Sequence, residues 1–204
     1  MTAALLVPLT LLAQERIASP RAMDEACARM EELYGKVVTY EEPPVNLTHQ
    51  VFVMPAVGGP ADVNKMVEAW KQQALVPNFR FLTSTLGYHV VPVSGGVLDG
   101  RVTIPVKTRT PTEHMLALET AVSVASGTMV DMGGFGMGPG GLDRVFRANP
   151  ESFPWGASHM VARDALVDLL LRSATTFTWH MKCQASPSFF TRLCALNLAR
   201  ISKN

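Results

Sequence analysis

The chain has 204 residues, of which 48% are hydrophobic and 17% are charged, and its 18 Lys and Arg residues against 17 Asp and Glu residues give a net charge of +1. This composition is typical of a globular protein and argues against a disordered chain, a collagen-like repeat or a basic nucleic-acid-binding surface. The length suffices for one sizeable hydrophobic core or two small ones, so folding needs neither disulfides nor a metal.

Residues 1–13 carry no charge and form a compact apolar run that ends directly before Gln14-Glu15-Arg16. The run is far shorter than the roughly 20 residues of a membrane-spanning helix, but it fits the apolar region of a secretory signal. The alternative is an apolar first helix or strand of the fold, and Pro8 argues against the helix. We expect cleavage after Ala13 and export of a bacterial protein, to the periplasm or out of the cell, without a membrane span in the mature chain.

A unit of a helix cap, an amphipathic helix and a short strand occurs three times. In the first unit Ser19 is the expected cap, with Pro20 at the first helical position. Gly35 ends this helix, and residues 36–40 are predicted to form a strand. The buried face of the helix is marked at helical spacing by Met23, Ala26, Cys27, Met30, Leu33 and Tyr34.

In the second unit Thr110 and Glu113 have the spacing of a capping box, in which each side chain binds the backbone amide of the other residue. Gly127 ends the helix, and residues 128–132 form its strand. The third unit is predicted to begin near Ser158.

The strand of the third unit is expected over residues 176–183, and residues 133–157 before this unit are rich in Gly and Pro and are expected to be a connector. Between the first two units we predict a strand over 48–54, a helix over 63–74, a hairpin of 79–82 with 88–93, and an edge segment over 101–106 that contains Pro105.

The C-terminal segment alternates apolar and polar residues, which predicts a hairpin with one buried face and one solvated face. Phe177, Trp179, Met181 and Cys183 alternate with Thr178, His180 and Lys182, and Cys194, Leu196 and Leu198 repeat the apolar period. One register pairs 183 with 194, 181 with 196 and 179 with 198.

This register places Cys183 opposite Cys194, and an oxidising compartment would let the two form a disulfide. The alternative is that all the cysteines stay reduced as small core residues. Cys27 lies on the buried helix face and is expected to remain a free thiol.

The predicted fold class is α+β, with small antiparallel or mixed sheets covered by helices and built from repeated helix–strand units. We expect an N-terminal region over 14–109 and a C-terminal region over 110–204, the latter containing the connector 133–157.

The first unit, MDEACARMEELYGKVVTY at 23–40, resembles the short N-terminal domain shared by secretins and TonB-dependent receptors. The third unit, residues 162–181, is similar but lacks the glycine. The chain as a whole resembles a group of exported bacterial proteins of unknown function. The segments that carry this likeness are YGKVVTYEEPP at 34–44, YHVVP at 88–92, VLDGRVTIP at 97–105 and ARDALVDLL at 162–170. The secretin-like resemblance implies a periplasmic interaction module without an active site.

Few residues are arranged as a catalytic or ligand-binding motif. Residues 136–141 fit the dinucleotide pattern G-x-G-x-x-G, but Asn149-Pro150 would stop the following helix early, which favours a plain connector. The acidic pair Glu41-Glu42 is expected on a solvated turn with diverging side chains. His89 and His180 are expected to face solvent or to be hydrogen-bonded.

The five histidines and three cysteines show no metal-binding spacing, so we predict no metal, no cofactor and no catalytic residues. Two functional hypotheses remain. The first is a non-enzymatic exported protein that binds another envelope protein or cell-envelope component through exposed strand edges, without nucleic acid. The alternative is an enzyme or small-ligand-binding protein that uses the Gly-rich loop 133–141.

Overall fold

The computed structural model describes residues 15–44, 50–54, 63–72, 78–132, 152–173, 175–185 and 192–201. Its helices are α1 (Ala22–Tyr34), α2 (Val63–Lys71), α3 (Pro111–Ser126) and α5 (Ala162–Leu170), with a short 3-10 helix η2 (Val97–Asp99). Its strands are β1 (Arg16–Ser19), β2 (Val38–Glu41), β3 (Gln50–Val53), β4 (Phe79–Thr83), β5 (Tyr88–Pro92), β6 (Arg101–Arg109), β7 (Met129–Asp131), β8 (Phe153–Val161), β9 (Phe177–Ala185) and β10 (Arg192–Arg200). The predicted α+β class is confirmed.

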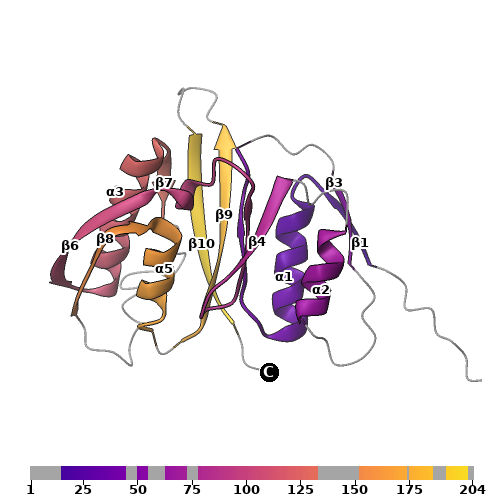
Figure 1. The fold of residues 1–204 in the computed structure, drawn as a ribbon, viewed down its shortest axis with the longest axis horizontal. Helices are drawn as coiled ribbons and strands as arrows, with labels where there is room; N and C mark the ends of the chain where they lie inside the picture. The colour runs from indigo at the N-terminus through magenta and orange to yellow at the C-terminus, as the bar shows by residue number, and fades with distance from the viewer. Residues whose placement is uncertain are drawn as a thin grey trace, which may run out of the picture.

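A mixed six-stranded sheet with the order β4-β5-β2-β9-β10-β7 forms the centre of the molecule (Figure 1). β2 runs parallel to both β5 and β9, and β9 pairs antiparallel with β10. Two further pairs, β1–β3 and β6–β8, are separate two-stranded sheets. Strands from both expected regions, 14–109 and 110–204, therefore build one sheet.

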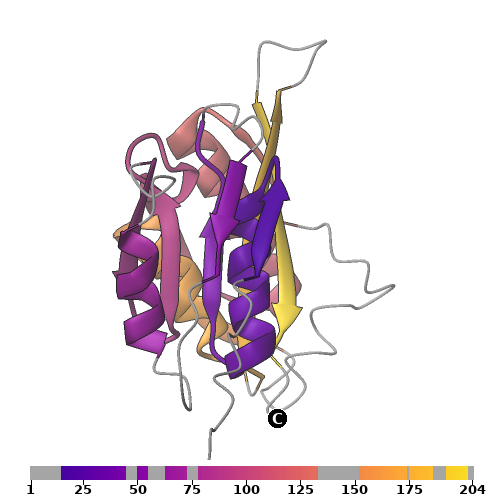
Figure 2. The ribbon, with the colours of Figure 1, turned by 90° about the vertical axis from the view of Figure 1, so that its right-hand side faces the viewer.

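The central sheet has a hydrophobic core on each of its faces. One core contains the apolar side chains of α1, α2 and the β1–β3 pair, and Figure 2 looks onto this side of the sheet. The other contains those of α3, α5 and the β6–β8 pair. Because a strand sends alternate side chains to opposite faces, β9 contributes Trp179 to the second core and turns His180 toward α1.

The predicted helix ends are confirmed at three places. The Thr110 hydroxyl accepts from the Glu113 amide, and the Glu113 carboxylate accepts from the Thr110 amide at 2.8 Å, which completes the capping box. Gly35 and Gly127 follow α1 and α3 with φ angles of 58° and 64°, in the left-handed region that glycine adopts without a steric penalty.

The predicted start of α1 is wrong. Ser19 is the last residue of β1, where it pairs with Gln50, so its backbone is extended. The helix begins at Ala22, with Arg21 at the cap position and without a side-chain cap. The Ser19 hydroxyl instead accepts from the Arg21 amide at 3.0 Å, which stabilises the turn between β1 and α1.

The predicted helix start near Ser158 is wrong, and so is the part of the connector that covers residues 153–157. These residues belong to β8, which pairs antiparallel with β6. Phe153, Trp155 and Ala157 are buried at every second position, which is the pattern of a strand with one face in a core. The third unit thus begins its helix at Ala162, and residues 133–151 lie outside the described part of the chain.

Candidate functional site

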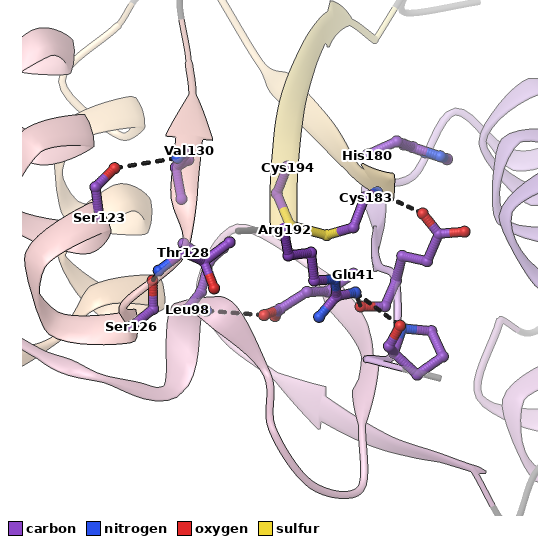
Figure 3. Close-up of a disulfide and its surroundings, with 12 residues drawn as sticks. Glu41, Leu98, Ser123, Ser126, Thr128, Val130, His180, Cys183, Arg192 and Cys194 are labelled. Atoms are coloured by element: carbon purple, nitrogen blue, oxygen red, sulfur yellow. Dashed lines mark hydrogen bonds between the residues drawn. A yellow bond between two sulfur atoms is a disulfide. The ribbon is translucent and has the colours of Figure 1, made fainter. Parts of the chain in front are cut away.

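The β9–β10 hairpin has the predicted register: Cys183 pairs with Cys194, Met181 with Leu196, and Trp179 with Leu198. In the structure a disulfide joins the sulfur atoms of Cys183 and Cys194 (Figure 3). Cys27 is a free, fully buried thiol, and burial raises its pKa well above the usual range.

The main-chain groups of Cys183 explain why this pair can be bridged. Its amide donates to the Glu42 carboxylate at 2.5 Å, and its carbonyl accepts from Arg21 at 3.4 Å, so both groups point toward β2 and away from β10. Cys183 and Cys194 are therefore a non-hydrogen-bonded pair, in which opposite side chains approach most closely. Arg192 fixes the start of β10 by donating to the carbonyls of Glu42 and Pro43.

The face of β9 that was predicted to be solvated is covered by α1 instead. Nδ1 of His180 lies 2.5 Å from Oδ1 of Asp24, and Nε2 lies 3.3 Å from Oε2 of Glu31. Lys182 binds the other oxygen of Asp24 at 2.7 Å, and the Thr178 hydroxyl donates to Glu31. Two acids on the buried face of α1 thus complement the polar face of β9.

The charges in this polar layer set its protonation. Burial alone would lower the pKa of His180, but the hydrogen bonds to Asp24 and Glu31 outweigh it and raise the pKa to about 9. For Asp24, burial raises the pKa, and the hydrogen bonds from His180 and Lys182 reverse this and lower it. At neutral pH His180 is a cation held between two carboxylates, so it fastens α1 to β9 and has no free nitrogen to accept a proton.

Glu41 and Glu42 diverge as predicted, but the prediction of a solvated turn is wrong. Glu41 is 1% exposed, binds Arg163 at 2.6 Å and accepts from the Leu98 amide at 2.8 Å. Glu42 binds Arg21 at 2.8 Å on the α1 side. Both acids are drawn inward because an arginine meets each of them there.

His89 is buried and hydrogen-bonded, one of the two environments expected for it. Its ring nitrogens lie 2.9 Å from the Thr39 hydroxyl and 2.7 Å from the Ser84 hydroxyl, and its ring stacks on Trp179. Burial and the charge of Arg163 lower the pKa of His89 to about 4. His89 is therefore neutral at pH 7, with both nitrogens engaged.

The outer side of β10 is paired over only part of its length. β7 contributes three residues, which pair with residues 193–195. The Val130 amide donates to the Ser123 hydroxyl of α3 at 3.1 Å (Figure 3). The amide of Met132, directly after β7, donates to the Glu119 carboxylate of α3 at 2.8 Å, so α3 holds β7 in place. Within the described ranges, no strand pairs with residues 196–200 on this side.

The register determines which main-chain groups the open edge presents. Because the amide and carbonyl of Cys194 point away from β9, those of Leu196, Leu198 and Arg200 do so as well. The segment 196–199 carries no charge. We call residues 196–200 the open edge of β10.

Sequence reasoning missed the buried polar groups that hold the sheet. Asp24 and Glu31 lie seven residues apart, so they share one face of α1 with Cys27. This helical spacing could have indicated from the sequence that both acids lie on the buried face. Arg163 is the second residue of α5, which also carries Asp164 and Asp168, and the sequence does not show that Glu41 and Asp99 meet it.

Two other predicted features lie outside the described residues: the signal segment 1–13 and the Gly-rich loop 133–141. In the described part of the chain, no three His, Cys, Asp or Glu side chains are grouped as a metal site requires. None of the described helices is both long enough and apolar enough to cross a membrane.

Comparison of this chain with protein-family models, with curated proteins and with solved structures gives no match.

Proposed function

We propose that this protein is a non-enzymatic exported interaction module that binds a partner in the cell envelope by strand addition at the open edge of β10. The observation that carries the proposal is the unpaired side of residues 196–200 in the described structure. An edge with free amides and carbonyls can accept a further strand, whose main-chain hydrogen bonds supply the affinity.

Two features favour this edge over the opposite edge of the sheet, β4. A charged residue in the middle of an edge strand discourages pairing, and β4 carries Arg80 inside the strand, whereas the open edge of β10 carries a charge only at its last residue, Arg200. The disulfide holds the start of β10 to β9, and Arg192 holds it to the Pro43 carbonyl. Because the strand is already ordered, binding a partner would cost little conformational entropy.

The disulfide supports export, because such bonds persist in oxidising compartments. The resemblance of residues 23–40 to the short N-terminal domain of secretins and TonB-dependent receptors agrees with a periplasmic interaction role.

A photo-crosslinking amino acid placed at Ala199 tests the proposal in exporting cells. We expect a defined covalent adduct from position 199, none from the matched exposed position Val124 on α3, and loss of the adduct when Leu198→Pro removes one outward amide. The melting temperature of L198P shows whether the variant is folded. Equal labelling from positions 199 and 124, or an adduct that survives in folded L198P, would overturn the proposal.

A further inference from the structure

We propose that the partner strand lies in line with β7, between the open edge of β10 and α3, and that it places an apolar side chain against Leu116 and an acidic side chain against Arg200. The inference rests on the proposed function, because it specifies the chemistry of the partner that adds to the same edge. Leu116 and Arg200 then select the partner, and the main chain of β10 supplies its hydrogen bonds.

β7 shows how a strand is held at this edge. It pairs with residues 193–195 of β10 on one side. On its other side, the Val130 amide donates to Ser123 of α3, and the following Met132 amide donates to Glu119. The side chains of Val130 and Met132 are buried in the core that α3 shares. A strand at this edge is therefore held by the main chain of β10 and by side chains of α3.

The same face of α3 continues past the end of β7. Leu116, Glu119 and Ser123 are three and four residues apart, so they share one face of the helix. The two hydrogen bonds show that α3 and β7 run in opposite directions. At a helical rise of about 1.5 Å per residue, Leu116 lies about 4.5 Å beyond Glu119, which is between one and two residues of a strand. Because Asp131 lies beside Ala195, Leu116 is level with the middle of the open edge.

The leucines on the two sides of this position are ready to receive an apolar side chain. Leu116 is 49% exposed, although Leu118 of the same helix is fully buried. Across from it, Leu198 is only partly buried against the same core. No strand of the described ranges lies between Leu116 and Leu198. An apolar side chain that continues the buried row of β7 would contact both leucines and remove their apolar surface from water.

Arg200 sets the second requirement. It lies on the same face of β10 as Leu198, since the two residues are two positions apart. It is exposed and forms no ion pair with any residue of the described ranges. Neighbouring strands advance by the same rise, so the residue that meets Arg200 is two positions from the apolar one. The partner segment is therefore an extended stretch in which one residue separates an apolar from an acidic side chain.

Photo-crosslinking amino acids at Leu116 and at Ala199 test the inference in exporting cells. The two positions lie on opposite sides of the added strand, because Ala199 is on the other face of β10 from Leu198. We expect both to trap the same protein, and mass spectrometry should place both crosslinks in one segment with the expected apolar and acidic residues. Val124, which is exposed on α3, is the matched control and should trap nothing. An adduct of position 116 with another part of this chain, or with a second copy, overturns the inference.

The yield of the adduct from position 199 gives a second readout. Leu116→Glu should lower it about tenfold, because a carboxylate would replace the apolar contact, whereas Val124→Glu should leave it unchanged. Arg200→Glu should lower the yield about threefold, and Arg200→Lys should retain most of it. Melting temperatures show whether each variant is folded.

These outcomes separate the inference from the proposed function. If position 199 traps a protein that position 116 does not, or if folded L116E keeps the full adduct, only the inference falls. If position 199 traps nothing, both proposals fall.

Discussion

Removing the Cys183–Cys194 disulfide should lower the free energy of unfolding without changing the fold. The bond closes a loop with a sequence separation of 11. In the chain-entropy model, a loop of this length restricts the unfolded chain by about 9 cal/mol/K, or about 3 kcal/mol at 25 °C. The folded hairpin retains its remaining support, because Glu42 still accepts from the Cys183 amide and Arg192 still binds the carbonyls of Glu42 and Pro43.

The assay is urea unfolding of the wild type and of the double variant Cys183→Ala/Cys194→Ala, followed by circular dichroism. We expect a loss of about 3 kcal/mol, together with one free thiol in the denatured, unreduced wild type. Cys27→Ala is the matched control for the loss of a buried sulfur that is not bridged. Three free thiols in the exported wild type would refute the disulfide, and a loss below about 1 kcal/mol with the bond intact in the wild type would refute the loop-entropy reasoning.

Three further changes test the packing of the helices against the sheet. Thr110→Ala should cost about 0.5–2 kcal/mol in denaturant unfolding, since it removes one half of the capping box; an unchanged midpoint would show that the cap carries no stability. Arg163→Met should cost about 3–5 kcal/mol because it leaves Glu41 buried without its cation, and adding Glu41→Gln should recover part of the loss; a single variant as stable as the wild type would contradict this. The pKa of His180 is raised to about 9, so the stability contributed by the imidazolium is fully present below pH 6.5 and is lost as the pH rises through 9. Urea midpoints of the wild type should therefore fall across this window more than those of His180→Gln, and parallel curves would contradict the assignment.

The features that the sequence predicted correctly are set by residues close together in the chain. The capping box needs only Thr110 and Glu113, and the helix end needs only a glycine that adopts a positive φ. The hairpin register was predictable as well, because three apolar pairs agree on one alignment between Cys183 and Cys194. In each case, residues close together in the sequence favour a single local conformation or a single register.

The features that the sequence did not reveal depend on distant partners. The alternation of apolar and polar residues on β9 is typical of a strand with one solvent-exposed face. His180 is buried and charged only because α1, more than a hundred residues earlier in the chain, packs on that face and brings Asp24 to it. From the sequence alone, Glu41 is expected on a solvated turn, and only the tertiary structure shows that Arg163 pairs with it. Burial of paired charges is decided by tertiary neighbours: local spacing can place Asp24 and Glu31 on the buried face of α1, but it cannot show which cations meet them there.

The placement of β9 between β2 and β10 has a consequence for the order in which the molecule can form. Tyr40 lies beside His180, so β2 gains its second neighbour only when a strand about 140 residues further along the chain is in place. Until then α1 has no polar strand to receive Asp24 and Glu31, and the sheet lacks its middle. Contacts between such distant residues slow folding, because the entropy of a long loop is lost before the contact forms. The sheet of the N-terminal half therefore stays incomplete until the β9–β10 hairpin docks against β2.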